Sequence, residues 1–227
     1  MTQAQHTLLY VGTYTRTTSE GIYLCRMDNF TGAVEQVSVT GGIENPSFLA
    51  LSPDRTRLYA ASEVTEAEGH TAGFVFAYSI SPGSGELTFL NQQSTGGPGP
   101  CHLSVDATGT HVVVANYHGG SVCVLPIQED GSPAERSEFI QHVGSSVNPQ
   151  RQQEAHAHSA NIDPTNRRVY TPDLGMDKVM IYRLDLDSGK LVANDPPFVQ
   201  VAPGAGPRHF SFHPDGKRTY VLNEIGN

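Results

Sequence analysis

Histidine, arginine and carboxylate side chains stand at the edges of short apolar runs, at spacings that repeat along the chain. The residues that begin and end these runs pair as follows: Ser47 with Glu63, His102 with Asn116 and Tyr117, His158 with Asp173, and both Arg208 and His209 with Glu224. A histidine can take up or release a proton near neutral pH. A guanidinium can hold an anion or a developing oxyanion. These residue types together indicate a site for acid–base chemistry.

Most of these residues also have a structural interpretation. His102 and His209 share one repeat position with Phe48 and Ser159, so this position can simply pack an axial channel. The charged residues that could serve only as an ion pair or as strand ends are Arg208 with Glu224, Glu63 and Asp173. Both interpretations stay open at this point.

His158 differs from the other histidines because it departs from its repeat position, where Ser47, Cys101 and Arg208 stand. It also follows a polar insertion, residues 144–155, that lacks hydrophobic periodicity. Long loops in compact folds more often carry function or move than support structure. The sequence therefore favours a functional role for His158.

Two further patterns carry little chemistry. His156 and His158 lie on one face of a strand, as metal ligands can, but no third ligand stands at a diagnostic spacing, so we expect no metal. The run Gly96–Pro100 has the composition of a phosphate loop, yet it precedes a strand and lacks the Lys-Ser/Thr pair. We expect it to make a tight passage between two structural units.

The elements that position these residues follow from a repeated phrase. It begins at Pro46, Pro100, Ala157 and Pro207, as in Pro-Ser-Phe-Leu-Ala-Leu-Ser-Pro-Asp and Pro-Arg-His-Phe-Ser-Phe-His-Pro-Asp, and thus recurs every 50 to 57 residues. A period of this length with strand-like content is typical of propellers and solenoids. Within one unit the start of the first strand and the end of the second meet at the same rim, which predicts a common axial cleft.

Each unit is predicted to hold four short strands. In the second unit they span 48–51, 57–62, 73–80 and 86–92, and each unit has an X-Gly dipeptide of the hairpin type: Thr31-Gly32, Ser84-Gly85, Asp130-Gly131 and Ser188-Gly189. Wholly apolar strands indicate burial on both faces. Four antiparallel strands per unit are typical of a propeller blade.

The predicted fold is all-β, a single β-propeller domain over residues 1–227. The expected blades are 7–40, 46–94, 100–143 and 157–201, with a partial blade over 207–227. The first lacks its innermost strand and the last has only two strands, which amounts to about four and a half blades in an open arc. We therefore expect a partial chain with an unpaired apolar strand near Tyr220.

Composition narrows the class of protein. Hydrophobic residues make up 37%, and the 23 glycines and 15 prolines suit short strands joined by tight turns. The net charge of −9 argues against nonspecific binding to nucleic acid or to anionic membranes. We find no signal peptide and no apolar run long enough to span a bilayer. The three cysteines lack CxxC spacing and fit a reducing compartment, so the cytosol is the expected location.

At the level of longer motifs, the chain resembles the seven-bladed β-propeller lactonases. The motifs that carry this resemblance are Pro100-Cys-His-Leu-Ser-Val, Val114-Ala-Asn-Tyr-His, His156-Ala-His-Ser, Pro172-Asp-Leu-Gly-Met-Asp-Lys-Val, Gly206-Pro-Arg-His-Phe-Ser-Phe-His-Pro-Asp-Gly and Tyr220-Val-Leu-Asn-Glu. The family includes the bacterial propeller-type 6-phosphogluconolactonase and is related to muconate-lactonising enzymes. The resemblance implies a longer chain with two more blades, and hydrolysis of 6-phospho-D-glucono-1,5-lactone to 6-phosphogluconate in the pentose phosphate pathway, without metal or organic cofactor.

The resemblance also implies roles for single residues. His158 is the expected acid–base residue, Glu224 its carboxylate partner and Arg208 the group that holds the anion or oxyanion, with Arg151 of the insertion assisting. The wider set expected to bind a small anionic sugar lactone comprises His102, Asn116, Tyr117, Arg151, His156, Asp173 and His209. A further arginine found in a later blade of the muconate-lactonising relatives has no counterpart in this sequence.

Two alternatives stay open. A muconate-type cycloisomerase would use much the same histidine, arginine and glutamate. A non-catalytic propeller that scaffolds protein partners would need diverse, uncharged residues in the cleft and anchors on its outer surface, and the ionisable rim argues against it.

Overall fold

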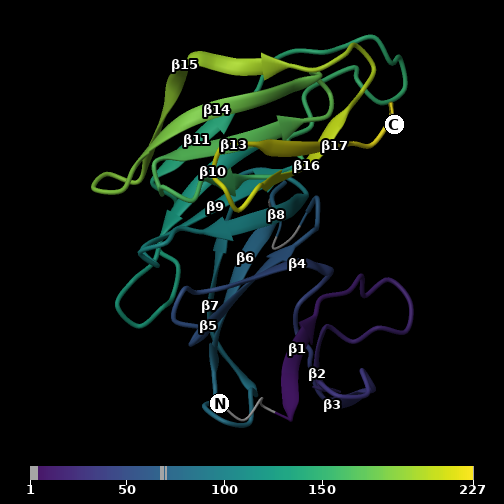
Figure 1. Cartoon of the computed structure of the whole chain (residues 1–227), viewed down its shortest axis with the longest axis vertical. Helices are drawn as coiled ribbons and strands as arrows, with labels where there is room; N and C mark the ends of the chain where they lie inside the picture. Colours follow the sequence, from purple (N-terminus) through teal and green to yellow (C-terminus); the bar gives the residue numbers. More distant parts are fainter. Residues whose placement is uncertain (1–4, 67–68, 70, 227) are drawn as a thin grey trace.

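The computed structural model describes residues 5–66, 69 and 71–226, and its strands form five antiparallel sheets that follow one another along the chain (Figure 1). The first sheet holds β1 (His6–Val11), β2 (Ile22–Asp28) and β3 (Val34–Thr40), and the second β4 (Pro46–Leu51), β5 (Arg57–Ser62), β6 (Phe74–Ile80) and β7 (Leu87–Ser94). The third holds β8 (Pro100–Val105), β9 (His111–Asn116), β10 (Ser121–Pro126) and β11 (Glu138–Gln141). The fourth holds β12 (Asn161–Ile162), β13 (Arg168–Asp173), β14 (Lys178–Asp185) and β15 (Lys190–Gln200), and the fifth β16 (Pro207–Phe212) and β17 (Thr219–Asn223).

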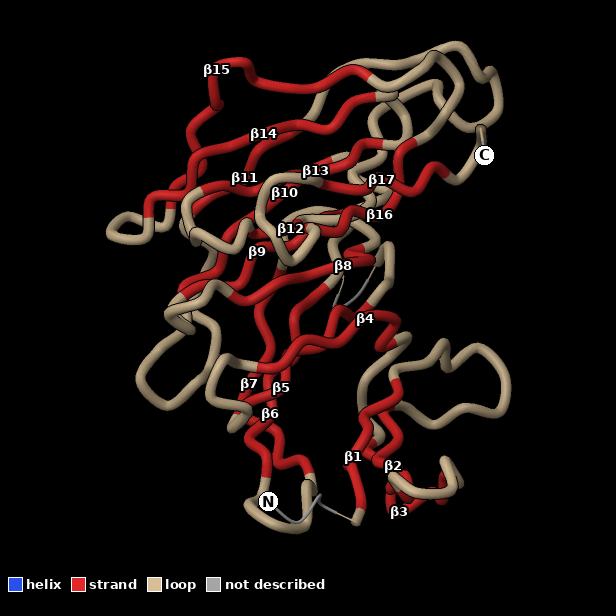
Figure 2. The backbone as a smooth tube through the Cα atoms, viewed as in Figure 1, coloured by secondary structure: helices blue, strands red, loops and turns tan. Residues whose placement is uncertain are grey.

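The all-β prediction is confirmed. Three sheets have four strands in the order in which they occur in the chain, the first sheet has three strands and the last has two. Within the described residues the chain forms strands and loops only (Figure 2), and no helix there is long and apolar enough to cross a membrane. We number the sheets as blades 1 to 5 from here on.

The hairpin turns form where the sequence predicts them. The four turn glycines all take positive φ, with values of 73° at Gly32, 77° at Gly85, 90° at Gly131 and 64° at Gly189. An L side chain strains this conformation, whereas glycine adopts it at little steric cost.

The hydrophobic core lies between successive blades. Strand β9 shows why its sequence is apolar throughout: Val112 and Val114 pack toward blade 2, while Val113 and Ala115 pack toward blade 4. Because neighbouring residues of a strand point to opposite faces, a strand covered on both sides needs a continuous apolar run. Each fully buried valine or leucine contributes about 1.5–3 kcal/mol to folding.

A β-bulge recurs at the start of the innermost strands. In blade 2 Pro46 pairs with Ser62 and Phe48 with Ala61, so Ser47 is the extra residue. The same shift makes Cys101 the extra residue of blade 3 and Arg208 that of blade 5. Bulges change the direction of a side chain at the edge of a sheet.

Blade 4 differs from the sequence-based expectation. Its first strand was expected from Ala157 onward, but regular pairing covers only Asn161–Ile162, with an isolated bridge between Ala157 and Asp173. Between the two pairings the first strand again has one residue more than its partner. The Ser159 hydroxyl donates to the Arg208 carbonyl oxygen, and the Ala160 N–H donates to the His102 ring. These contacts to blades 5 and 3 replace the ladder.

Strand β17 leaves an open edge in the described structure. It pairs with β16 on one side only, and the side chains of Tyr220 and Leu222, which point to the same face, are each 56% exposed. Their strand neighbour Val221 is half-buried. An apolar strand with unpaired backbone groups favours pairing with another chain.

We therefore predict concentration-dependent association of this chain through β17. The double change Tyr220→Lys with Leu222→Lys should weaken it by about tenfold or more, since lysines on two edges that pair repel each other. Sedimentation velocity over a range of concentrations measures the effect. Phe30→Lys, which changes a 97% exposed residue in a hairpin turn, is the control. Equal association of all three proteins would contradict the prediction.

Candidate active site

The extra residues of the bulges meet in a cleft at the axis. Ser47, Cys101 and Arg208 all line it, together with His158 of the irregular stretch in blade 4. The cleft has a volume of about 350 Å³, which is within the range of small-molecule sites. The complete lining is Tyr14, Ser47, Phe48, Glu63, Cys101, Tyr117, His118, Arg151, His158, Arg208 and His209.

A second set of residues enters from the ends of the second strands. Glu63 follows β5, Tyr117 follows β9 and Glu224 follows β17, so they hold equivalent positions in blades 2, 3 and 5. Glu63 and Tyr117 line the cleft, and Glu224 contacts residues that line it. Residues at the starts of the first strands and at the ends of the second strands thus come together at one rim, as predicted.

Glu224 is the centre of the charged cluster. Its Oε2 atom lies 2.9 Å from Arg208 Nε and 3.4 Å from His158 Nε2, and its Oε1 atom accepts a hydrogen bond of 2.5 Å from Arg151. Arg151 also donates to the Tyr117 hydroxyl at 3.1 Å. One carboxylate therefore joins the insertion, blade 4 and blade 5.

Arg208 has hydrogen-bond donors that are available to a ligand. Its Nε–H is directed at both Glu224 and His158 Nε2, the latter at 3.1 Å. Its two terminal nitrogens make no hydrogen bond to the described residues, which leaves four N–H groups of a side chain that is 38% exposed. Paired donors of this kind suit a carboxylate, a phosphate or a developing oxyanion.

The protonation states follow from burial and charge. Burial lowers the pKa of His158 to about 4, and the positive charge of Arg208 adds to this effect. Burial raises the pKa of Glu224, but the hydrogen bond from Arg151 and the charges around it outweigh burial and lower the pKa below its ordinary value. At neutral pH the site thus holds a neutral imidazole and a carboxylate. Because Nε2 accepts from Arg208, the proton of His158 resides on Nδ1.

Cys101 lies beside His158 but is not a nucleophile. Its Sγ atom is 3.7 Å from His158 Nδ1 and 3.2 Å from the His158 carbonyl oxygen. Burial, with the charge of Glu63 adding to it, raises the pKa of the thiol. A reactive cysteine needs the thiolate form. Cys101 therefore forms part of the cleft wall.

Five of the predicted site residues do not line the cleft: Glu224, which contacts three of the lining residues, His102, His156, Asn116 and Asp173. Asn116 is fully buried and donates to the Ser121 hydroxyl at 3.1 Å. Asp173 is also fully buried, with one oxygen 2.7 Å from His142 Nδ1 and the other accepting the His156 N–H. The expectation that both side chains face the cleft is wrong, because the last residue of β9 and of β13 points into the blade; in blade 3 it is the next residue, Tyr117, that lines the cleft.

The predicted histidines take different places. His102 is buried against Phe48, at 4.1 Å between ring centroids, and burial lowers its pKa to about 3, which fits a packing role. His156 stacks on Tyr117 at 4.7 Å, and its Nδ1 lies 3.0 Å from the Tyr117 carbonyl oxygen. His209 lines the cleft, with its ring 5.7 Å from that of His158.

The insertion that carries Arg151 is held in place by Asp177. This fully buried carboxylate accepts hydrogen bonds from Ser146 and Gln152 of the insertion and from the backbone of Gly204 and Gly206 before β16. Burial raises its pKa, but the four hydrogen bonds together lower it below the ordinary value of 3.8. Asp177 therefore fixes the two segments that present Arg151 and Arg208.

Sequence reasoning missed three members of the cleft. Tyr14 comes from the loop between β1 and β2, His118 follows the strand-end residue Tyr117, and Cys101 holds the repeat position of Arg208. The repeat could have indicated Cys101, because that position was already compared across blades. Nothing in the sequence indicates how the loop of Tyr14 folds over the cleft.

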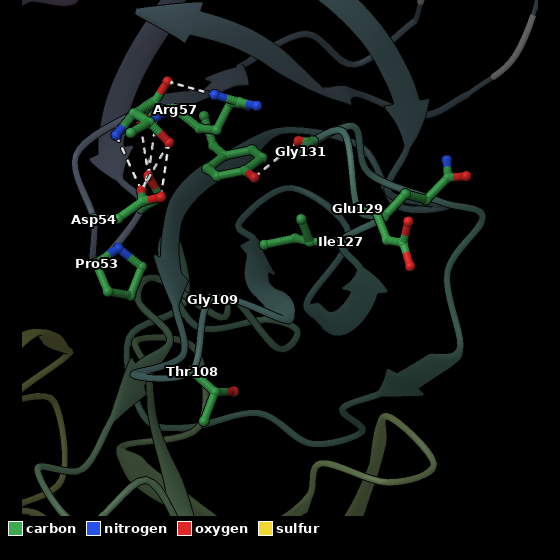
Figure 3. A pocket seen from close by; sticks show the side chains of 12 residues that line it. Pro53, Asp54, Arg57, Thr108, Gly109, Ile127, Glu129 and Gly131 are labelled. Atoms are coloured by element: carbon green, nitrogen blue, oxygen red, sulfur yellow. Dashed lines mark hydrogen bonds between the residues drawn. The ribbon is translucent and has the colours of Figure 1, made fainter.

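A second cavity lies on the opposite rim, among turns of blades 2 and 3 (Figure 3). Its volume is about 210 Å³. Its polar groups satisfy one another: Asp54 accepts from Ser52 and Thr56, the Arg57 Nε–H donates to the Asp130 carbonyl, and the Tyr59 hydroxyl donates to the Gly131 carbonyl. These groups tie turns together, so the axial cleft is the better candidate site.

His156 and His158 do not form part of a metal site in the described residues, where no group of three or more histidine, cysteine, aspartate or glutamate side chains could hold a metal ion. Each ring has other partners: Tyr117 for His156, and Arg208 with Glu224 for His158.

Comparison with known proteins gives consistent matches. The model of the family "Lactonase, 7-bladed beta-propeller" matches residues 8–227. A 6-phosphogluconolactonase of Bacillus subtilis is 42% identical over 96% of this chain, and one of Formosa agariphila is 32% identical over 96%. The chain spans 60% and 61% of their respective lengths.

Solved structures agree. A Bacteroides fragilis structure superposes with a TM-score of 0.92 at 34% identity, covering 100% of this chain and 63% of that one. The periplasmic gluconolactonase of Pseudomonas aeruginosa superposes with a TM-score of 0.87 at 37% identity, covering 96% of this chain and 62% of that one.

Asp177→Asn should loosen the insertion. The amide places an N–H₂ group among four donors, so we expect about 2 kcal/mol less stability at pH 7. The lowered pKa means that the carboxylate stabilises the fold above about pH 4 and that this contribution is lost as the pH falls below the pKa of the folded state. The difference between the variant and the parent should therefore shrink at pH 3, as measured by denaturant unfolding.

Limited trypsin digestion at Arg151 gives a second measurement, since a loosened insertion is cleaved faster. The control is Asp163→Asn, which changes a carboxylate that caps the turn before β13 by accepting the N–H groups of Arg167 and Arg168. Equal cleavage rates at Arg151 in Asp177→Asn and in the control would show that Asp177 does not hold the insertion.

Proposed function

Because the chain belongs to the seven-bladed β-propeller lactonases, we propose that it hydrolyses 6-phospho-D-glucono-1,5-lactone to 6-phosphogluconate, a step of the pentose phosphate pathway. The names of the Bacillus subtilis and Formosa agariphila relatives support this substrate. The observation that carries the proposal is that His158, Arg208 and Arg151, which line the axial cleft, all contact one carboxylate, Glu224.

In the proposed mechanism His158 is the base. Its Nε2 atom carries no proton at neutral pH, because burial keeps the imidazole neutral. The Nε2 lone pair becomes free for water when the Arg208 Nε–H, which is directed at both residues, bonds to Glu224 alone. A pKa near 4 makes it a weaker base than the near-neutral histidine expected from the sequence. A lactone carbonyl is already electrophilic, so a weak base that positions water is sufficient. Glu224 stabilises the imidazolium that forms, from 3.4 Å away.

Water attacks the lactone carbonyl carbon C1 as Nε2 takes one of its protons. The C1 carbonyl oxygen becomes an oxyanion, which the free N–H groups of Arg208 stabilise. The tetrahedral intermediate then collapses, the bond between C1 and the ring oxygen breaks, and the ring oxygen takes the proton from the imidazolium. The product is the open-chain acid, and His158 returns to its neutral form.

Arg151 is assigned to the phosphate of the substrate. Its side chain is 44% exposed and lies on the insertion, beside Tyr117, where it can meet an anionic group outside the reacting ring. A guanidinium binds phosphate oxygens through paired hydrogen bonds. The expectation of a cytosolic location stays a prediction from the sequence.

His158→Ala should lower kcat/KM for 6-phosphogluconolactone by about 10²–10⁴-fold, the usual contribution of a general base. The measurement is lactone loss above the spontaneous rate. His213→Ala, which changes a partly exposed histidine in the turn between β16 and β17, is the matched control and should retain activity. Parent-like turnover by His158→Ala would remove His158 from the mechanism. Formation of muconolactone from cis,cis-muconate instead would identify a cycloisomerase.

The pH profile tests the assignment of the base independently. Protonation of His158 in the free enzyme abolishes its function, so kcat/KM should stay level from pH 7 to about pH 5 and fall tenfold per unit below about pH 4. Glu224 is in contact with His158, so the apparent pKa belongs to the pair. An inflection near pH 6.5 would contradict a buried, neutral His158.

A further inference from the structure

Glu63 is the repeat equivalent of Glu224, but its surroundings differ. Glu224 contacts two arginines and a histidine, whereas the Glu63 carboxylate accepts one hydrogen bond of 2.7 Å from the Tyr14 hydroxyl and forms no ion pair with any described residue. Glu63 and Tyr14 both line the axial cleft. The cleft therefore has a carboxylate without a direct ion pair to any described residue, although Arg16 lines an adjoining pocket together with Glu63.

Hydrogen bonds in the adjoining loops hold Tyr14 and Glu63 in place. The Thr15 N–H donates to the Asn45 side-chain oxygen, and the Asn45 N–H donates to the Thr15 hydroxyl. The Glu63 N–H donates to the Asn45 carbonyl oxygen at 3.0 Å. The buried Asn45 thus connects the two segments that present Tyr14 and Glu63. The Arg16 guanidinium lies over the Tyr14 ring, 5.2 Å from its centroid.

The unused hydrogen-bond acceptor positions of Glu63 and Tyr14 suit the hydroxyl groups of a ligand. A carboxylate has about four acceptor positions, of which Tyr14 uses one. Partial burial of Tyr14, with its hydrogen bond to Glu63, raises the pKa of the phenol to about 12, so it stays protonated and its oxygen can accept a further hydrogen bond. Both the Glu63 carboxylate and the Tyr14 oxygen can therefore accept hydrogen bonds from an uncharged, hydroxylated ligand.

We propose that Glu63 and Tyr14 form a subsite for the vicinal hydroxyls of a polyhydroxylated ring, apart from the arginines Arg151 and Arg208 that bind its anionic groups. The inference rests on the proposed function in one respect, because it assigns the hydroxylated part of the same substrate. Cys101 lines the same cleft as Glu63 and Arg208. A substrate bound across Cys101 has its anion at Arg208 and Arg151 and its hydroxyls at Glu63.

This subsite makes the cleft selective. An ionised carboxylate accepts hydrogen bonds from a diol but repels a second negative charge. A dianion without hydroxyls, such as cis,cis-muconate, should therefore bind weakly, because it makes no such hydrogen bonds and is repelled. A site built to bind substrate hydroxyls also discriminates strongly against analogues that lack them, because its polar groups then stay unpaired. Glu63 is thus a specificity-determining residue, and His158 with Arg208 serves the reaction itself.

The kinetic test compares three lactones on the parent protein and on Glu63→Ala and Tyr14→Phe. They are 6-phosphogluconolactone, glucono-1,5-lactone without the phosphate, and δ-valerolactone without phosphate or hydroxyls. Glu63→Ala should lower kcat/KM by about tenfold or more for the two hydroxylated lactones and by less than about twofold for δ-valerolactone. Tyr14→Phe should show the same selectivity with a smaller loss. Arg151→Ala should lower kcat/KM most for the phosphorylated lactone, and less for the other two, which lose only its support of Glu224.

A binding test keeps the proposal separate from catalysis. Gluconate and hexanoate are six-carbon monocarboxylates that differ in their hydroxyls, and titration calorimetry compares their affinities. The parent should prefer gluconate, and Glu63→Ala should remove most of that preference. Glu44→Gln, which removes a carboxylate beside Asn45 in an adjoining pocket outside the cleft, is the control for the local negative field.

The outcomes distinguish the two proposals. Selective loss with hydroxylated ligands in either test supports the subsite, and equal loss with every ligand or no loss at all overturns it. If the parent hydrolyses no lactone above the spontaneous rate but binds gluconate through Glu63, the proposed function fails and the subsite stands. If hydrolysis occurs and Glu63→Ala behaves like the parent, the proposed function stands and the subsite fails.

Discussion

The extra residue at the start of each innermost strand is the constraint on which the site depends. A regular strand would alternate its side chains between the two neighbouring blades and present none to the axis. The bulge adds one residue to one strand, and Ser47, Cys101 and Arg208 consequently point into the cleft. Because blades 2, 3 and 5 share this bulge, the residue at one repeat position can differ between blades while the hydrophobic packing between blades is kept.

Charge balance in the cleft determines what each of these residues can do. Glu224 is surrounded by cations, so it organises Arg151, Arg208 and His158 and contributes little free negative charge. Glu63, the equivalent residue three blades earlier, forms no ion pair with any described residue, so both of its oxygens have positions left for a ligand. One repeat position thus serves as a structural hub in one blade and as a binding group in another.

The sequence predicted the strands, turns and order of blades well, because apolar runs and X-Gly dipeptides act locally. It also identified His158, Arg208 and Glu224, which the structure brings within hydrogen-bonding or ion-pair distance. It was wrong about Asn116 and Asp173, which are fully buried, and in blade 3 the next residue, Tyr117, lines the cleft instead. A shift of one residue reverses the direction of a side chain, and a strand end read from sequence is uncertain by about that amount.

The sequence by itself determined the architecture of this protein, because a repeat of 50 to 57 residues with two-sided apolar strands can bury its surface only by stacking blade on blade. Only the tertiary structure decided which residues share the cleft. Tyr14 reaches Glu63 across 49 residues, and Arg151 reaches Glu224 across 73, through loops without periodicity. Such contacts depend on buried anchors, Asn45 for one loop and Asp177 for the other. Their hydrogen-bond partners are backbone and side-chain groups that come together only in the folded chain.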